Sequence, residues 1–294
     1  IAARLAVLLS GKNRRNVLVF HTSHGYLFHD DRSLKKWAYL IPEILCARVT
    51  DVLMVMNHED LAIAQKYRLC KNRDNIYYIN GMGVDFDRLR GPLQPTKEQR
   101  SPFDLKEGEF IFVYAAEFSK RKNHQLLLQG FAKALHEWNG LHIRLALAGD
   151  GALQEEMKEL SRSLGIEDHV IFLGYVREMR ELYVCCQAAV TASRIDGLPF
   201  NVMEAICCGL PVIASDVKGH RELITHGVNG LLFEDGNVEQ LACRILQLLN
   251  DHEFLVRCKS NGIFGMEAFS IDAVLPSIMK IYQKYIPFWG GIQQ

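Results

Sequence analysis

Two carboxylates flank the predicted start of a helix in the second half of the sequence. Asp196 stands in a polar loop with Gly197 and Pro199, and Glu204 follows after seven intervening residues. Proline suits the first turn of a helix, so we expect the helix to begin at about Pro199. The free backbone N–H groups at a helix start favour an anion such as a diphosphate, and two acids beside it suit the hydroxyl groups of sugars. The alternative is an ordinary strand-to-helix turn in which Glu204 is a solvated helix acid.

Elements on both sides of this loop can position the two acids. A strand is predicted over residues 186–192, directly before the loop, and another over 211–215, after the helix. Strand, loop, helix and strand form a βαβ unit, and open α/β sheets bind ligands where their strands end. The pattern therefore predicts a ligand site at the carboxyl edge of a parallel sheet.

Three more loops follow predicted strands at this same edge. The four loops together comprise residues 117–123, 149–151, 174–176 and 193–200. They contain lysines, glycines that permit close backbone approach, the flat ring of Tyr175, and acids. The Gly-Asp-Gly at 149–151 is by itself an ordinary turn, but the four loops in order suit a nucleotide diphosphate that carries a polar group.

The whole chain alternates predicted strands and helices, which is typical of an α/β fold with parallel sheets. In the first half, strands are predicted over 16–20, 52–56 and 76–80, helices over 1–10, 33–48 and 58–67, and a polar loop over 21–26. Residues 91–108 contain three of the eight prolines. We therefore predict two Rossmann-like domains facing a cleft: residues 1–92, a linker over 93–108, a second domain over 109–270 that carries the four loops, and a helix over 271–294 that packs back toward the first domain.

Composition restricts the possible functions. The 294 residues carry a formal net charge of zero, which disfavours a nucleic-acid-binding protein. Eight cysteines, including two adjacent pairs in apolar runs, show no zinc or redox spacing, so we expect packed, reduced thiols in a cytoplasmic protein. We expect no signal peptide, and no apolar run in the sequence reaches the roughly 18 residues of a membrane span. Because the sequence begins with Ile in an apparent helix, we expect the numbering to start inside a longer protein.

The residues around these loops resemble one enzyme family. Asp196 and Glu204 are similar to the Glu-x7-Glu motif of the retaining GT-B glycosyltransferases of family 4. Other stretches look like the same family: Gly197-Leu198-Pro199, Glu204-Ala205, Gly209 to Asp216, Gly219-His220-Arg221-Glu222, Gly227-Val228-Asn229-Gly230, Ala148-Gly149-Asp150-Gly151 and Phe172-Leu173-Gly174-Tyr175. Thr22-x-His24-Gly25, Asn57-x-Glu59-Asp60 and Gly81-x-Gly83-Val84-Asp85 resemble enzymes of bacterial capsule and exopolysaccharide synthesis. The resemblance covers nearly the whole chain.

The resemblance implies a role for each matching position. Glu204 would bind the ribose, Asp196 the donor sugar, and His24 the donor sugar or the reaction centre. Lys122 would neutralise the diphosphate and help the leaving group depart. The remaining donor-binding positions are the backbone N–H groups of Gly197, Leu198 and Phe200, and Gly174, Tyr175 and Val176 at the base. The family is metal-independent, needs no cofactor, and retains the anomeric configuration.

The sequence departs from the family at three places. Asp196 is one methylene shorter than the usual Glu. Glu117 stands where many members have Arg, so Lys120 or Arg121 would supply the second positive charge. The opening strands and Gly-rich phosphate loop of the family are absent, so the first domain is expected to be incomplete, and the chain is expected to bind the donor and turn over slowly.

The expected reaction is the transfer of a sugar from a nucleotide donor, UDP by preference, to a lipid-linked or polysaccharide acceptor. The alternatives are a GT-B nucleotide-sugar epimerase, against which the Asp196 and Glu204 spacing argues, and a donor-binding remnant with little turnover.

Some residue patterns suggest sites of other kinds. Asp85-Phe86-Asp87 resembles a metal motif but lies near the linker, and the histidines at 21, 24 and 29 with Asp30 and Asp31 fix no ligand geometry. The basic patches at Arg14-Arg15 and Lys35-Lys36-Trp37 are either solvated faces or a weak peripheral contact with the inner face of a membrane.

Overall fold

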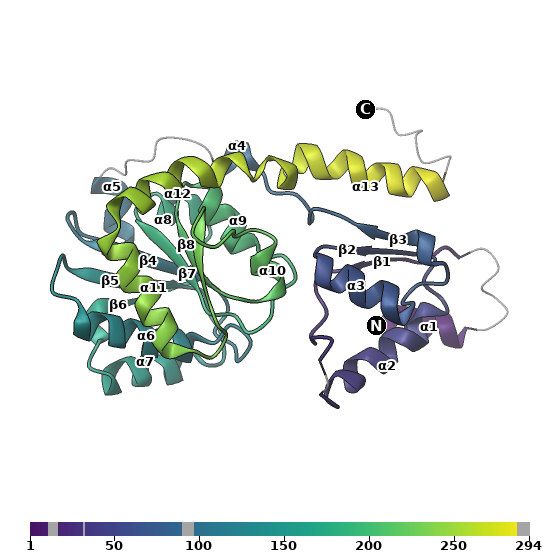
Figure 1. Ribbon diagram of the computed structural model, residues 1–294, viewed down its shortest axis with the longest axis horizontal. Coiled ribbons are helices and arrows are strands. Elements are labelled where there is room, and N and C mark those ends of the chain that lie inside the picture. The colour runs from purple at the N-terminus through teal and green to yellow at the C-terminus, as the bar shows by residue number, and fades with distance from the viewer. Residues whose placement is uncertain (11–16, 32, 90–96, 287–294) are drawn as a thin grey trace. The chain divides into compact units, whose positions relative to one another are not determined.

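The chain forms two compact units, each built around a parallel sheet. The computed structural model describes residues 1–10, 17–31, 33–89 and 97–286. The first unit consists of Ile1–Gly83, Ile195–Leu198 and Ala268–Gln294, and the second of Val84–Arg194 and Pro199–Glu267 (Figure 1). The predicted α/β class is confirmed. The domain limits predicted at residues 92, 108 and 270 stay a prediction.

The sheet of the first unit has three parallel strands in the order β1-β2-β3. They are β1 (Phe20–Ser23), β2 (Val52–Val55) and β3 (Ile76–Tyr78). Phe20 lies opposite Val52, and Leu53 lies opposite Ile76. All four residues of the central β2 are buried, which explains its uninterrupted apolar sequence.

The span predicted for the first strand, residues 16–20, was wrong: the strand lies later in the chain. Residue 16 lies outside the described residues, and pairing begins only at Phe20. Val19 instead meets the turn before β2: its N–H donates to the Asp51 carboxylate (2.9 Å), and its carbonyl accepts from the N–H of Asp51 (2.9 Å). The polar residues 21–23, predicted as loop, therefore form the strand, and the loop starts at His24.

Helices of the first unit are α1 (Ala2–Leu9), α2 (Lys36–Ala47), α3 (His58–Tyr67) and α13 (Ile271–Tyr285), with a 3-10 turn η2 (Arg73–Asn75). The last helix packs on the sheet through aromatic side chains. Tyr282 stacks on Phe20 of β1 with ring centroids 4.6 Å apart, and the hydroxyls of Tyr285 and Tyr77 are 2.7 Å apart. Among the helices of the described residues, none is both long and apolar enough to cross a membrane.

The second unit contains a six-stranded parallel sheet in the order β6-β5-β4-β7-β8-β9. Its strands are β4 (Phe110–Ala115), β5 (Ile143–Ala148), β6 (Val170–Gly174), β7 (Ala188–Thr191), β8 (Val212–Ser215) and β9 (Gly230–Phe233). From β4 the chain moves outward through β5 to β6, then returns to the other side of β4 with β7. The strand order thus reverses between β4 and β7, as in doubly wound sheets.

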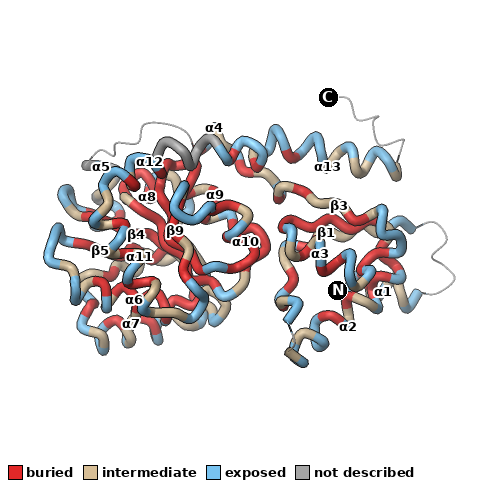
Figure 2. The backbone as a smooth tube through the Cα atoms, viewed as in Figure 1, coloured by how far each residue is buried: buried red, intermediate tan, exposed pale blue. Residues whose placement is uncertain are grey.

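Helices flank this sheet. They are α4 (Phe86–Leu89), α5 (Lys97–Arg100), α6 (His124–Glu137), α7 (Gln154–Ser163), α8 (Met179–Tyr183), α9 (Phe200–Cys207), α10 (Lys218–Arg221), α11 (Val238–Asn250) and α12 (His252–Phe264), with 3-10 turns η3 (Ser101–Phe103) and η4 (Glu167–His169). The turn η5 (Glu267–Phe269) spans the point where the chain passes from the second unit to the first. Figure 2 shows buried residues concentrated along the strands. A Cβ on Gly130 would lie 2.6 Å from Leu241, so this glycine lets α6 and α11 pack closely. All eight cysteines are free thiols, and only Cys243 is exposed.

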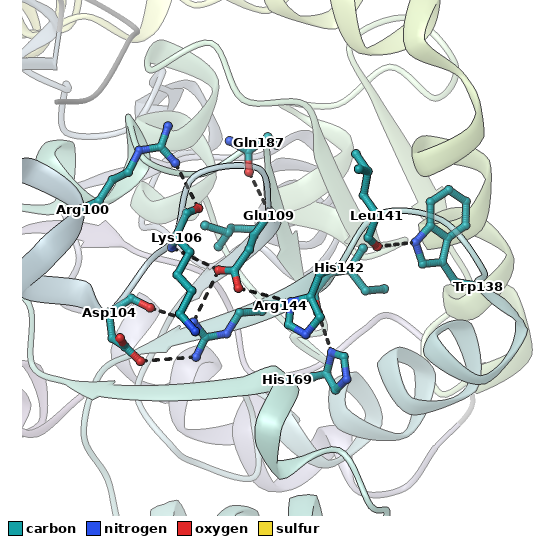
Figure 3. A network of polar contacts seen from close by, with 12 residues as sticks. Arg100, Asp104, Lys106, Glu109, Trp138, Leu141, His142, Arg144, His169 and Gln187 are labelled. Atoms are coloured by element: carbon teal, nitrogen blue, oxygen red, sulfur yellow. Dashed lines mark hydrogen bonds and ion pairs between the residues drawn. The ribbon is translucent and has the colours of Figure 1, made fainter. Parts of the chain in front are cut away.

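A polar network closes the amino edge of the sheet, where β4 and β5 begin (Figure 3). Arg144 donates to the carbonyl of Asp104 (2.7 Å) and pairs with Glu109 at 3.5 Å. Glu109 also accepts from the N–H of Lys106 (3.1 Å) and lies 3.3 Å from the His142 ring. These contacts fasten the segment before β4 to the sheet.

Candidate functional site

The strand order places two loops side by side at the carboxyl edge of the second unit's sheet. Residues 116–123 follow β4, residues 192–199 follow β7, and β4 and β7 are paired parallel strands. Crossovers leave these neighbouring strands in opposite directions, which makes this the topological switch point, where open α/β sheets bind their ligands. Two of the four predicted loops therefore begin at the position where a ligand is expected.

Buried Tyr114 of β4 connects these two loops. Its hydroxyl donates to the carbonyl of Lys122 (2.8 Å) and lies 3.0 Å from the Ser193 hydroxyl. Next to this contact, the N–H of Arg194 donates to the carbonyl of Arg121 (2.9 Å). The loop that carries Lys122 is thus held against the loop that leads to α9.

The basic side chains of the loop after β4 differ in their exposure to solvent. Lys122 is half-buried, whereas Lys120 is exposed and lines a pocket of about 190 Å³ with Asn123 and Arg194. Asn123 turns the chain into α6 with a left-handed φ of 53°. Burial, and then the charge of Lys122, lower the pKa of His124 to about 3, so this ring is neutral near pH 7.

Three of the four predicted loops line one pocket of about 460 Å³. The loop after β4 contributes Glu117, the loop after β5 contributes Gly149 and Asp150, and the loop after β6 contributes Tyr175 and Val176. The Tyr175 side chain is 77% exposed, so its ring face is available to a planar ligand.

The glycines in these loops are required by close backbone approach. A Cβ on Gly149 would lie 2.1 Å from the carbonyl oxygen of Ala116, so no other residue fits. The N–H of Gly149 donates to the carbonyl of Gly174 (2.7 Å), where φ is 65°. The Gly-Asp-Gly sequence therefore joins three strand ends and does more than turn the chain.

Glu204 of α9 lines a second pocket, of about 210 Å³, with Arg88 and Arg180. Arg177 and Met179 line both pockets, so the two adjoin. Burial raises the pKa of the Glu204 carboxyl, and the Arg88 charge and a hydrogen bond with the Tyr183 hydroxyl partly offset this rise. The half-buried carboxylate has the chemistry to accept hydrogen bonds from ligand hydroxyl groups.

The start of α9 has the form that the sequence predicts. Pro199 is the N-cap residue, and Phe200, 44% exposed, is the first residue of the helix. No side chain of the N-cap residue satisfies the first backbone N–H groups. Leu198 is buried and, with Gly197, belongs to the first unit.

In the first unit, the loop that carries His24 meets the segment that carries Asp196. A Cβ on Gly25, where φ is 123°, would lie 2.6 Å from the Cα of Gly197. A Cβ on Gly197 would lie 1.8 Å from the carbonyl oxygen of His24. His24 is exposed and Asp196 is buried. The roles predicted for His24, Lys122, Asp196 and the donor-binding residues stay predictions.

Asp85, His29 and Asp30, which belong to the two suggested metal motifs, have other partners. The carboxylate of Asp85 accepts from the N–H of Arg88 (3.1 Å) at the start of α4. His29 lies 2.8 Å from Glu59, and Asp30 pairs with Lys66 at 2.5 Å. Within the described parts of the chain, no group of three or more His, Cys, Asp or Glu side chains could hold a metal ion.

Sequence reasoning missed some residues that shape the site. Tyr114 reads as one more aromatic in an apolar strand, and Arg88 as one more basic residue near the linker, so neither gives a signal. Asn57 and Asp60 were named in the resemblance to capsule and exopolysaccharide enzymes, and Asn-x-x-Asp at a helix start is also a capping pattern, but the contact of Asn57 with Gly197 was not predicted. Asn57 caps α3, accepting from the N–H of Asp60 (2.7 Å).

Comparison with known proteins gives a family match. Residues 95–263, more than half of the chain, match the family model described as glycosyl transferases group 1. EpsD of Bacillus subtilis (strain 168), which is named as a glycosyltransferase, is 32% identical over 289 residues, which are 97% of this chain and 74% of that protein.

Two further proteins are similar over most of their length. The UDP-Gal:alpha-D-GlcNAc-diphosphoundecaprenol alpha-1,3-galactosyltransferase of Escherichia coli is 24% identical, and the alignment covers 96% of this chain and 72% of that enzyme. The crystal structure of HepE from Anabaena in complex with UDP-glucose superposes with a TM-score of 0.79 at 18% identity, covering 96% of this chain and 76% of HepE.

Proposed function

Because the chain belongs to the glycosyl transferases group 1 family and has the GT-B fold, we propose that it is a retaining, metal-independent glycosyltransferase of family 4. Its donor would be a UDP-sugar and its acceptor a lipid-linked or polysaccharide glycan. Two likenesses support this choice: HepE was crystallised with UDP-glucose, and the Escherichia coli relative is named for UDP-Gal and a diphosphoundecaprenol acceptor.

One observation carries the donor assignment: the loops after β4, β5 and β6 line one pocket, which adjoins the pocket beside Glu204. The uracil would lie in the first pocket against Tyr175 and Val176, next to the backbone of Gly174. The ribose then reaches Glu204, which accepts hydrogen bonds from its hydroxyl groups. Arg177 and Met179 line both pockets, which supports the proposal that one nucleoside would extend across them.

The diphosphate would bind where positive charge gathers. The uncapped start of α9 offers backbone N–H groups at Phe200, after those of Gly197 and Leu198, and Lys122 adds a full charge. Lys120 or Arg121 would supply the second cation. These groups stabilise charge on the departing phosphate, so the reaction would need no metal ion.

The proposed transfer makes one bond and breaks one bond. The bond between the anomeric carbon and the phosphate oxygen of UDP breaks, and the acceptor hydroxyl bonds to the same face of the sugar. The hydroxyl proton passes to the departing phosphate oxygen. Asp196 would hold hydroxyl groups of the donor sugar, and His24 would contact the sugar or the reaction centre.

A peripheral contact with the cytoplasmic face of a membrane is a further part of the proposal. Leu34, Trp37, Ile41 and Leu45 recur at helical spacing along and before α2, and all four are exposed. Exposed Lys35 lies beside them. An apolar stripe beside a cation suits an anionic lipid surface.

Wild-type protein should sediment with vesicles that contain anionic lipid, and Trp37→Glu should sediment less; equal sedimentation would contradict this contact.

The transferase assignment can be tested with nucleotide sugars. The protein is incubated with UDP-glucose, UDP-galactose and UDP-N-acetylglucosamine, and UDP release is measured while proton NMR identifies the sugar. UDP release with an initially α-configured sugar supports a retaining transferase. A changed sugar still attached to UDP would instead identify an epimerase, and saturable UDP-sugar binding without release would identify a binding protein.

A further inference from the structure

Asn57 uses every polar atom of its side chain. The amide oxygen accepts from the N–H of Asp60 (2.7 Å), which caps α3. The amide nitrogen donates to the Asp60 carboxylate (2.8 Å) and to the carbonyl of Gly197 (3.1 Å). A cap needs only the oxygen, and Asp or Ser would supply it equally well. The two donated hydrogen bonds therefore serve another purpose than capping.

Asp60 extends this contact to a second loop. The same carboxylate oxygen that accepts from Asn57 also accepts from the backbone N–H of Tyr26 (3.1 Å). Asn57 and Asp60 are both 0% exposed. Loss of one of their hydrogen bonds would therefore leave a buried polar group without a partner, which costs free energy of folding. The pair thus holds Tyr26, two residues after His24, and Gly197, directly after Asp196.

The two loops that this pair holds are in direct backbone contact. Side chains are excluded between them, because a Cβ on Gly25 or on Gly197 would lie 2.6 Å or 1.8 Å from the facing backbone. With no side chain in between, the separation of the loops depends on backbone contact and on the Asn57 and Asp60 hydrogen bonds. A small change in these bonds therefore moves the backbone that carries His24 relative to the backbone that carries Asp196.

We propose that Asn57 and Asp60 are positioning residues that fix the separation of His24 and Asp196 for sugar transfer. This inference rests on the proposed function, in which both residues meet the donor sugar. Neither Asn57 nor Asp60 touches the reacting atoms in this account. A misplacement of about 1 Å around a reacting centre can cost about 100-fold in rate, so a buried pair that sets this spacing should act on turnover.

Asn57→Asp tests the proposal with the least change of shape. The variant keeps an oxygen to cap α3 and replaces both donated hydrogen bonds with a carboxylate facing Asp60 and the Gly197 carbonyl. We expect kcat for UDP release from the best UDP-sugar to fall about 10- to 100-fold. KM for the UDP-sugar should change less than about threefold, and the affinity for UDP alone should not change, because the nucleotide pockets lie in the second unit.

Asn237→Asp is the matched control. Asn237 caps α11 by accepting from the N–H of Gln240 (2.9 Å) and lies in the second unit, away from both loops. The same chemical change there should leave kcat unchanged. A fall in kcat equal to that of Asn57→Asp would assign the effect to a general property of cap substitution and overturn the proposal.

A double-mutant cycle with Asp60→Asn separates positioning from plain loss of stability. Two residues that act through one spacing should give a double variant no slower than the slower single variant, whereas independent effects multiply. All variants are assayed well below their melting temperatures.

Wild-type kcat in a folded Asn57→Asp protein, or multiplied effects in the double variant, would overturn the inference while leaving the proposed function intact. Failure of the wild-type protein to bind UDP would instead overturn the proposed function, and this inference with it.

Discussion

The two edges of the second unit's sheet use charge in opposite ways. At the amino edge, charged side chains meet each other: Arg144 and Glu109 are paired, and their side chains are only 11% and 9% exposed (Figure 3). At the carboxyl edge, Lys120, Arg194 and Glu204 line pockets. Burying a charge is costly unless a partner compensates it, so the carboxyl edge is stabilised less by its charged groups than the amino edge is.

The difference separates residues that hold the fold from residues that can meet a ligand. Substitution at the amino edge should lower stability and leave nucleotide affinity unchanged. Substitution at the carboxyl edge should lower affinity or turnover and leave stability nearly unchanged.

Lys122→Ala should have the largest effect. Loss of one charged group that stabilises the departing phosphate typically costs about 100- to 1,000-fold in kcat, or about 3–4 kcal/mol. We expect UDP release to fall by this factor and UDP affinity to fall less, by about tenfold. Lys133→Ala on α6 is the control, because Lys133 pairs only at the surface with Glu239. Equal turnover in Lys122→Ala and wild type would refute the assigned role.

Arg144→Met should affect only the fold. It leaves Glu109 and the carbonyl of Asp104 without their cationic partner, and we expect a loss of about 2 kcal/mol in the free energy of unfolding. Thermal unfolding should show a melting temperature lower by about 4–8 °C. Arg162→Met removes an exposed pair with Glu159 and should leave the melting temperature nearly unchanged. If Arg144→Met weakens UDP binding at a temperature where it is folded, the proposed division of roles between the two edges is contradicted.

Glu204→Gln should weaken UDP binding about tenfold, which corresponds to about 1.4 kcal/mol, because an amide accepts ribose hydroxyl hydrogens less strongly than a carboxylate. Burial raises the pKa of Glu204 above the ordinary 4.5, so the carboxylate is lost at a higher pH than for an exposed Glu. Wild-type UDP affinity should therefore fall as pH falls through this raised pKa, while the affinity of Glu204→Gln stays flat. Calorimetry across pH 4–8 measures both curves.

The raised pKa of Glu204 also determines how its carboxyl group affects the stability of the fold as pH changes. A carboxyl whose pKa is raised by folding stabilises the folded state at pH values below its unfolded pKa, and this contribution is lost as pH rises through the folded pKa. Glu204→Gln should thus have a melting temperature equal to or above that of wild type at neutral pH. A clear drop in its melting temperature would place Glu204 with the stabilising charges of the amino edge.

At neutral pH, His124→Phe should have the smallest effect, below about 1 kcal/mol. The ring stacks on Phe118 with centroids 4.1 Å apart, and neither ring nitrogen has a hydrogen-bond partner. Folding lowers the pKa of His124 to about 3 from 6.5, so wild type loses stability as pH falls below 6.5. Relative to wild type, the variant should gain stability between pH 6.5 and 4, as thermal unfolding at several pH values will show. A difference that is constant with pH would contradict this.

Local patterns predicted much of the fold. Apolar runs between polar turns placed β7 and β8 of the second unit within about two residues, since buried parallel strands need uninterrupted apolar sequence. The prediction of the first strand was wrong because Val17, Leu18 and Val19 have the apolar sequence of a strand, whereas hydrogen-bonded pairing with β2 begins only at Phe20. Nothing local encodes a register between distant segments.

The site was predictable to a similar extent. Four loops after strands could be named in advance, and three of them line one pocket. The switch point between β4 and β7 could not be named, because strand order is a property of the whole sheet. The contacts of Tyr114 with Ser193 and of Asn57 with Gly197 were not predicted for the same reason: the partners lie far apart in sequence.

The most direct test is a calorimetric titration of UDP into wild type, Glu204→Ala and Arg144→Met, each at a temperature where it is folded. If the carboxyl edge binds the donor and the amino edge only holds the fold, Arg144→Met binds UDP as wild type does and Glu204→Ala binds at least about tenfold more weakly. Equal affinity in Glu204→Ala and wild type would contradict the account.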